Sequence, residues 1–299
     1  SVDLNSYYLQ GGYFAKNTSV KLIAFAGKEK TYHAWGYATK EEMEKFGRRY
    51  NPCGEMYTDA DGNKHYYTDQ TDNYLQKNYQ LLLNHSFSTA WNLNVALHYT
   101  KGDGYYEEYK PGSSLVEYGL KPFNPDGTET NESDLVRQKK MDNKFGGGVF
   151  SLNYTGNRLT ASLGGGLNQY RGNNFGKVTW VKNYIGNLSP EHEYYRNKSK
   201  KTDGNIYLKA NYDLTSTLSA YADLQYRHID YTIDGVNDKY DWNKNALRPL
   251  AVDKKFDFFN PKVGLNWNIT PNHRLYASFS VAQKEPTRNN YTDGDPDSY

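Results

Sequence analysis

The sequence has little cysteine and no long apolar run. Its 299 residues include one cysteine, Cys53, so an internal disulfide framework is excluded. The longest apolar stretches, such as Leu81-Leu82-Leu83, are far shorter than the roughly 18 apolar residues of a transmembrane helix. The opening residues Ser1 to Leu4 do not have the character of a signal peptide. These features exclude a disulfide-stapled domain and a helical membrane protein.

The sequence also has no large excess of positive or negative charge. The chain has 36 Lys and Arg against 34 Asp and Glu, a balance that gives no basis for nucleic-acid binding. Aromatic residues, by contrast, are abundant, with 30 Tyr, 12 Phe and 5 Trp in a chain of mean hydropathy -0.93. A lipid-facing β-barrel combines these properties, because only alternate residues are apolar, the lumen is polar and aromatic girdles mark both membrane interfaces.

Strict alternation of apolar and polar residues is the clearest pattern. In residues 217–226, Leu218, Ala220, Ala222, Leu224 and Tyr226 share one face, as in a β-strand with one apolar side. Similar patterns predict about ten strands, each near the ~9–11 residues needed to cross a membrane at a tilt. We expect them near residues 7–15, 20–27, 79–87, 91–100, 150–154, 159–167, 205–212, 217–226, 260–269 and 275–281.

The connections between these strands alternate in length. Short ones lie near residues 17–18, 88–90, 155–158, 215–216 and 270–272, and long polar ones span 28–78, 101–144, 171–202 and 230–255. Outer-membrane barrels alternate in this way because tight periplasmic turns lie at one end and long extracellular loops at the other. The alternative, a soluble β-sandwich with core aromatics, rarely needs so many long loops. The predicted fold class is therefore all-β, an antiparallel transmembrane β-barrel portion with long extracellular loops.

Two local motifs in the first long loop have simple structural interpretations. Thr39 and Glu42 have the spacing of a capping box, and Gly47 provides an end for a short helix. Residues 59–63 (DADGN) resemble part of a calcium loop but lack the later bidentate Glu of an EF-hand, which favours a turn. Residues 191–193 (EHE) suggest an iron ligand, but no second His completes a ligand spacing. We therefore assign no metal site and no cofactor.

Several segments resemble the TonB-dependent outer-membrane receptors, and those of the Bacteroides group in particular. They are residues 258–265 (FFNPKVGL), 275–282 (LYASFSVA), 283–291 (QKEPTRNNY) and the loop residues 47–56 (GRRYNPCGEM). The resemblance implies a barrel of about 22 strands around an N-terminal plug. It leads us to expect that residues 1–299 are a partial barrel domain, with the plug domain and the C-terminal strands outside this sequence.

The resemblance also implies a function and a location. It predicts a receptor of the bacterial outer membrane that binds a scarce nutrient, such as an iron chelate (siderophore) or haem, and imports it with energy supplied by TonB. The expected partners are outer-membrane lipid, TonB through the N-terminal region, and a small-molecule ligand. A glycan-importing receptor of the same family is the first alternative. A passive porin or a barrel enzyme is the second, although the sequence has no nucleophile elbow, Walker loop or zinc-binding His cluster.

Exposed aromatic residues in the long loops are the candidate ligand contacts. Large flat side chains provide apolar contact area at a small cost in conformational entropy, which suits chelates and sugars. Packing of the loops against one another is an equally open interpretation. The adjacent acids Glu107 and Glu108 have no opposed partner in the sequence pattern, so we assign no catalytic role and predict that the protein is not an enzyme. The ligand-binding candidates are Trp35, Tyr37, Tyr105, Tyr106 and Trp180.

Overall fold

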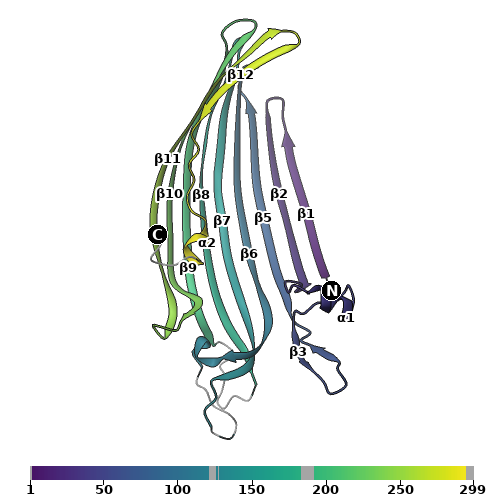
Figure 1. Ribbon diagram of the computed structural model, residues 1–299. Helices are drawn as coiled ribbons and strands as arrows, with labels where there is room; N and C mark the ends of the chain where they lie inside the picture. The colour runs from purple at the N-terminus through teal and green to yellow at the C-terminus, as the bar shows by residue number, and fades with distance from the viewer. Residues whose placement is uncertain (1, 121–125, 127, 183–191, 294–299) are drawn as a thin grey trace.

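The computed structural model describes residues 2–120, 126, 128–182 and 192–293. It contains a ten-stranded antiparallel sheet that curves into an open trough (Figure 1). Each strand pairs with its neighbours along the chain, so the order is β1-β2-β5-β6-β7-β8-β9-β10-β11-β12, and the predicted fold class is confirmed. The strands are β1 (Val2–Phe14), β2 (Thr18–Tyr32), β5 (Thr71–Ser86), β6 (Trp91–Ser114), β7 (Glu132–Thr155), β8 (Leu159–Val181), β9 (Glu193–Asp213), β10 (Leu218–Asp241), β11 (Ala246–Thr270) and β12 (His273–Ser280).

Most strands are longer than the sequence pattern predicts. β6 has 24 residues and β11 has 25, so the expected lengths of ~9–11 were too short for them. Much of the predicted long loop at 101–144 is therefore strand, up to Ser114 and again from Glu132. The physical reason is that backbone pairing continues beyond the point where the outer side chains cease to be apolar. Apolar alternation reports contact with lipid, whereas the hydrogen-bonded ladder does not require it.

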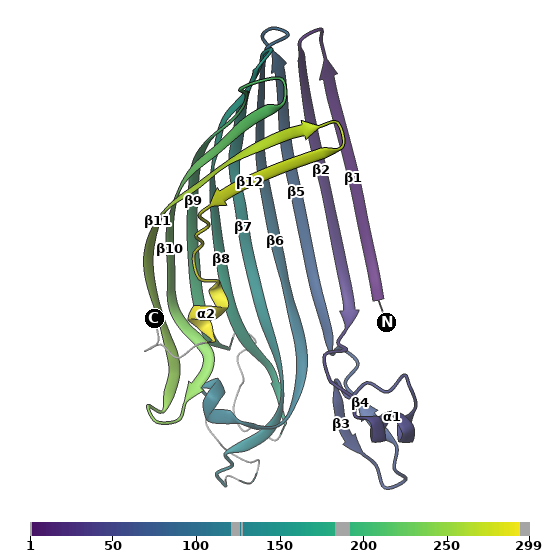
Figure 2. The same cartoon turned by 45° about the horizontal axis from the view of Figure 1, so that its top comes forward.

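The predicted alternation of connections is confirmed except for the last long one. The five predicted short turns lie at one end of the sheet, at the top in Figure 1, and the connections predicted to be long lie at the other. The connection expected at residues 230–255 is a four-residue turn at 242–245, because β10 and β11 extend through most of that range. The first long connection contains α1 (Lys40–Phe46) and a separate hairpin of β3 (Glu55–Thr58) and β4 (Lys64–Tyr66) (Figure 2). Within the described ranges, no helix is both long and apolar enough to cross a membrane.

The predicted helix start is confirmed in detail. The backbone N–H of Glu42 donates to Thr39 Oγ1 at 3.2 Å, and the backbone N–H of Thr39 donates to the Glu42 carboxylate at 2.8 Å. The helix ends at Gly47, whose φ of 87° is a conformation that residues with a Cβ rarely adopt. This reciprocal cap satisfies backbone donors that would otherwise lack an intrahelical partner.

The two faces of the sheet differ in polarity. Leu97 lies on the convex face and is 48% exposed, and it pairs with Leu81 on β5. Asn94 lies on the opposite, concave face, where its side-chain carbonyl accepts a hydrogen bond of 2.6 Å from Asn84. An apolar outer wall and a polar inner wall are the arrangement of a barrel that stands in lipid.

The buried apolar clusters lie toward the long-loop end of the sheet. One is formed where η1 (Leu115–Tyr118) folds against β7, β8 and β9. The other is formed where Tyr291 of α2 (Arg288–Thr292) packs on β10 and β11. Their buried members are Leu115, Tyr118, Leu120, Leu135, Val178, Tyr194 and Tyr195 in the first cluster, and Ile229, Tyr231, Ile233, Leu250 and Tyr291 in the second.

Candidate ligand-binding site

Two consecutive tyrosines of β6 point to opposite faces of the sheet. Tyr106 lies on the concave face, where its ring meets that of Trp35 edge-on at 5.0 Å between centroids. Tyr105 lies on the convex face, with the ammonium of Lys140 4.7 Å from its ring centroid. The alternation of side chains along a strand imposes this separation. Of the two, only Tyr106 faces the interior of the trough.

The loop that follows β2 adds two aromatic rings beside Tyr106. His33 and Trp35 stack at 3.9 Å with an interplanar angle of 18°, and His33 also meets Tyr106 edge-on at 5.8 Å. Trp35 is 52% exposed whereas His33 is only 2% exposed. Burial lowers the pKa of His33, against the smaller opposing influence of nearby acids, so its ring is neutral at neutral pH. The three rings form a rigid aromatic corner with one open surface.

Charged side chains lie next to this corner on the concave face. The ammonium of Lys139 is 5.6 Å from the ring centroid of Tyr106 and 5.9 Å from that of Tyr195, and it pairs with Asp238 at 2.5 Å. Burial opposes the charge on Lys139, but Tyr106 and the hydrogen bond to Asp238 keep its pKa above the usual value. We call His33, Trp35, Tyr106, Lys139 and Asp238 the mouth cluster, because they lie where the trough opens at the long-loop end.

A second ion pair continues the charged wall along β6 and β7. Arg137 Nε donates to Glu108 Oε1 at 2.6 Å, and its guanidinium lies 5.9 Å from the ring centroid of Tyr118. Glu107 faces the other way, where it accepts hydrogen bonds from Tyr67 and Gln138. The adjacent acids Glu107 and Glu108 are therefore separated by the sheet and each has its own partner.

The remaining candidates lie apart from the mouth cluster. Tyr37 is 97% exposed in the loop two residues beyond Trp35. Trp180 lies on the convex face and stacks against Tyr109 with 6.5 Å between ring centroids. The structure thus brings Trp35 and Tyr106 together and places Tyr105 and Trp180 on the other side of the sheet.

Sequence reasoning missed His33, Lys139 and Asp238. Lys139 is the direct cross-strand partner of Tyr106, so a correct strand length for β6 and β7 would have paired them. Asp238 lies in the segment of β10 where the register with β11 shifts between Val236 and Tyr240, an irregularity that the sequence pattern does not signal. It pairs with Lys139 across the two intervening strands, β8 and β9.

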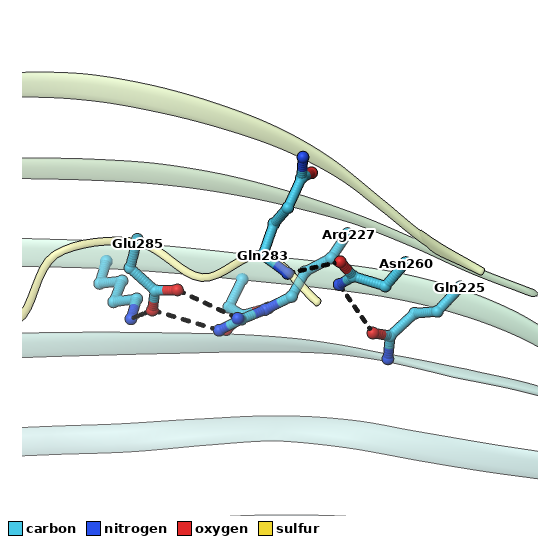
Figure 3. Close-up of polar contacts among 7 residues, drawn as sticks. Gln225, Arg227, Asn260, Gln283 and Glu285 are labelled. Carbon is cyan, nitrogen blue, oxygen red and sulfur yellow. Dashed lines mark hydrogen bonds and ion pairs between the residues drawn. The ribbon is translucent and has the colours of Figure 1, made fainter. Parts of the chain in front are cut away.

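A polar segment after β12 crosses the interior of the trough. We call residues 281–293 the strap; the labelled residues of Figure 3 show its first anchors. Asn260 Oδ1 accepts a hydrogen bond of 2.8 Å from the backbone N–H of Gln283, and Asn260 in turn donates to Gln225 at 3.4 Å. Glu285 pairs with Arg227 at 3.0 Å and with Lys201. The same Arg227 guanidinium makes a bidentate pair with Asp203 on β9.

The far end of the strap has its own anchors. Arg288 Nη2 donates to Asn197 Oδ1 at 2.8 Å, and Asn237 Nδ2 donates to the backbone carbonyl of Thr292 at 2.7 Å. Tyr291 packs edge-on against Tyr231 with 6.0 Å between ring centroids. The strap therefore narrows the trough from the β9 to β11 side.

The acidic loop motif is a turn, as the sequence predicts. Asp59 Oδ1 accepts backbone hydrogen bonds from Asp61 and Asn63 at 3.0 and 2.8 Å, and His65 lies 2.9 Å from its other oxygen. The hydrogen bond with His65, followed by those of Asn63, lowers the pKa of Asp59 to about 2. Across the described part of the chain, no group of three or more His, Cys, Asp and Glu side chains has the arrangement of a metal site.

The sequence analysis considered residues 191–193 as iron ligands. Glu191 lies outside the described residues, whereas His192 and Glu193 are described. His192 Nε2 lies 2.7 Å from the backbone carbonyl of Tyr118, and Glu193 pairs with Arg196 at 2.5 Å. Both side chains are thus engaged in local structure.

Comparisons with known proteins agree on one architecture. The family described as TonB dependent receptor-like, beta-barrel matches residues 24–297. The ferric-catecholate import receptor Fiu from E. coli K12 superposes with a TM-score of 0.62 at 13% identity, over 95% of this chain and 48% of its own. The ferric citrate transporter FecA superposes with a TM-score of 0.60 at 9% identity, over 93% of this chain and 35% of the transporter. The ferric yersiniabactin uptake receptor FyuA from Yersinia pestis superposes with a TM-score of 0.56 at 8% identity, over 93% of this chain and 37% of the receptor.

These structural similarities establish the fold, and they concern only part of each receptor. The chain spans about half, or less, of the length of the solved receptors that it matches. No curated protein sequence matches it significantly.

Proposed function

Because this chain belongs to the family of TonB-dependent receptor β-barrels, we propose that it is part of a receptor that imports an iron chelate with TonB-supplied energy. Members of this family are transport receptors of the bacterial outer membrane and not enzymes. The convex apolar face is therefore the lipid-facing wall, the short turns are periplasmic and the long connections extracellular.

We further propose that the ten strands are one portion of a larger closed barrel. β1 and β12 each have a single neighbour in the described sheet. Unpaired strand edges cannot persist in lipid, since their backbone donors and acceptors would lack hydrogen-bond partners. The proposed receptor also contains a plug and an N-terminal segment that engages TonB, and both belong to the complete polypeptide.

The mouth cluster is the observation that supports the ligand class. It combines a half-exposed indole, a phenol and an ammonium at the extracellular mouth of the polar interior. Aromatic rings and cations together suit ligands that carry both flat apolar rings and negative charge, as aromatic iron chelates do. We propose Trp35, Tyr37 and Tyr106 as contacts from this side. Tyr105 and Trp180 lie on the convex face, so they contact a ligand only if it approaches over the outer rim.

The test is uptake by the complete receptor in a deletion strain grown with limited iron. Ferric catecholate, ferric citrate and haem serve as separate labelled probes, each with and without a functional TonB. We expect TonB-dependent uptake of one iron compound to be restored by the intact gene. If uptake of all three is the same with and without the receptor, the proposed substrate class is wrong.

One observation favours a glycan as the alternative ligand. Tyr37 is 97% exposed and Trp35 is 52% exposed, and such open aromatic surfaces stack well on sugar rings. Growth of the same deletion strain on oligosaccharides as the carbon source distinguishes this alternative, because a glycan receptor would restore growth on a glycan and leave iron uptake unchanged.

A further inference from the structure

A short stretch near the extracellular end of β10 lies outside the regular ladder of hydrogen bonds. The register of β10 with β9 ends at Gly235, and its register with β11 shifts between Val236 and Tyr240. Within the described sheet, residues 237–239 therefore have no cross-strand partner in either register, as is typical of a bulge. We call residues 236–240 the irregular segment, and its side chains make their contacts elsewhere.

Two neighbouring residues of the irregular segment contact two different parts of the trough. Asp238 pairs with Lys139 of the mouth cluster at 2.5 Å, across β8 and β9. Asn237, the residue before it, contacts the strap instead, because its Nδ2 donates to the backbone carbonyl of Thr292 at 2.7 Å. The strap runs from the end of β12 to α2 along the interior of the trough (Figure 2). The irregular segment thus lies between the strap and the mouth cluster.

The amide of Asn237 joins these two contacts. Its Nδ2 is the donor to Thr292 of the strap, and its Oδ1 accepts a hydrogen bond of 2.7 Å from the backbone N–H of Asp238. Asn237 is only 7% exposed. A buried amide that loses one partner is costly, because the group left behind has no water to replace that partner. The amide therefore fixes the backbone of Asp238 relative to the strap.

A second buried amide, on β9, connects the strap to the start of the irregular segment. Asn197 is 3% exposed. Its Oδ1 accepts a hydrogen bond of 2.8 Å from Arg288 of the strap, and its Nδ2 donates to the backbone carbonyl of Val236 at 3.0 Å. Lys239 and Asp293 add an exposed ion pair of 2.9 Å, which contributes little by itself. The two amides are therefore the main connections between the strap and the irregular segment.

Lys139 depends on Asp238 for its place in the mouth cluster. The residue opposite Lys139 on β8 is Gly176, which has no side chain to support the long lysine. The ammonium reaches Asp238 on β10, and it lies 5.6 Å from the ring centroid of Tyr106. A lysine that is free to move loses conformational entropy when a ligand fixes it, which weakens binding. The pair with Asp238 holds the ammonium in place before a ligand arrives.

We infer that Asn197 and Asn237 are positioning residues of the mouth cluster. Through these two amides the strap holds the irregular segment, and Asp238 in that segment holds the ammonium of Lys139 beside Tyr106. The ligand affinity of the mouth cluster therefore depends on how the strap is seated in the interior of the trough. The inference rests on the ligand site proposed above, but the position of Lys139 is measurable without a ligand.

The first test measures the accessibility of Lys139 in the complete receptor. Acetylation of its ammonium by a water-soluble reagent is followed by mass spectrometry in the wild type, in Asn237→Ala and in the control Asn243→Ala. Asn243 is exposed in the turn that follows β10, so the control removes the same side chain outside the irregular segment. We expect Asn237→Ala to raise the acetylation rate of Lys139 about threefold or more, with the wild-type rate in the control. Equal rates in the two variants would overturn the inference.

Arg288→Gln is a second variant for the same measurement, because the loss of a buried amide can impair folding. The change removes the hold of the strap on Asn197 and leaves β9 and β10 unaltered. Acetylation of Lys139 should again be faster than in the wild type. A wild-type rate in Arg288→Gln would exclude Asn197 as a positioning residue.

The second test measures the affinity for whichever of ferric catecholate, ferric citrate and haem the wild-type receptor binds. Asn237→Ala should weaken binding about three- to tenfold. In an Asp238→Asn background the same change should have no further effect, because the ion pair through which Asn237 acts is then absent. An additive loss in the double variant would overturn the inference, and so would unchanged or tighter binding by Asn237→Ala. If the wild type binds none of the three compounds, the proposed function is wrong, whereas faster acetylation in Asn237→Ala would still support the positioning of Lys139.

Discussion

Arg227 on β10 and Glu285 in the strap, 58 residues apart in sequence, form an ion pair with 3.0 Å between Nη1 and Oε2. Arg227 also holds Asp203, and Glu285 also holds Lys201, so two positive and two negative groups balance within the polar interior. A balanced, hydrogen-bonded group of charges tolerates partial burial that a single charge would not. This group sets where the strap crosses the trough.

Glu285→Gln is expected to loosen the strap. The change leaves Arg227 and Lys201 with one carboxylate between them and removes charged hydrogen bonds that contribute about 1–3 kcal/mol locally. Hydrogen exchange of residues 281–293 in the complete receptor should therefore become faster. Lys284→Gln, an adjacent change at an exposed side chain, is the control and should leave exchange unchanged. Equal protection in both variants would contradict the anchoring role of Glu285.

Tyr106→Ala is expected to reduce ligand affinity by about tenfold or more, because an aromatic contact of this kind is a frequent centre of binding energy. Tyr105→Ala removes the same side chain from the convex face and should have little effect. Labelled-ligand binding to whole cells measures both. A larger loss from Tyr105→Ala would show that the ligand does not enter through the concave face.

Leu97→Arg is expected to impair membrane assembly. Leu97 is on the lipid-facing wall, where an Arg near the bilayer centre costs about 2–4 kcal/mol. Asn94→Arg places the same side chain in the polar interior and should be tolerated much better. The fraction of folded receptor in isolated outer membranes is the measurement, and similar assembly of both variants would refute this assignment of the two faces.

Gly235→Ala is expected to destabilise the extracellular part of β10 by about 1–3 kcal/mol. Its φ of 124° is unfavourable for a residue with a Cβ, and that Cβ would lie 2.3 Å from the backbone oxygen of Arg196. The irregular segment that follows presents Asp238 to Lys139, so ligand affinity should fall together with thermal stability. Gly27→Ala is the control, since an added Cβ there meets no described atom within 4 Å. Matching thermal midpoints for the two variants would refute the proposed strain.

The stack of His33 on Trp35 is expected to weaken in acid. Burial lowers the pKa of His33 in the folded protein below the ordinary value of about 6.5. The unfolded loop therefore takes up a proton first, so the stacking free energy is fully present above pH ~6.5 and is lost as the pH falls below it. Iodide quenching of tryptophan fluorescence should rise in that range. A His33→Gln variant should show no such step, and an identical step in both proteins would exclude His33 as its origin.

Residues 91–99 show how much the sequence could predict. Their strict alternation specified both the strand and its lipid-facing side, because hydrocarbon accepts only apolar side chains. The same logic failed beyond Lys101, where both faces contact water and alternation no longer carries information. Tyr105 and Tyr106 were therefore treated as one loop pair, although the continuing strand separates them.

The sequence by itself determined the ten strands, the five short turns and the apolar wall, because each depends on side-chain patterns within a single segment. Only the tertiary structure decided which residues from different segments meet. The strand register paired Tyr106 with Lys139, and the loop after β2 brought His33 and Trp35 to Tyr106. The fold also carried Glu285 back to Arg227. These relationships arise from pairing over long distances in the chain, where hydrogen-bonded register and charge balance act together and no local pattern specifies the partner.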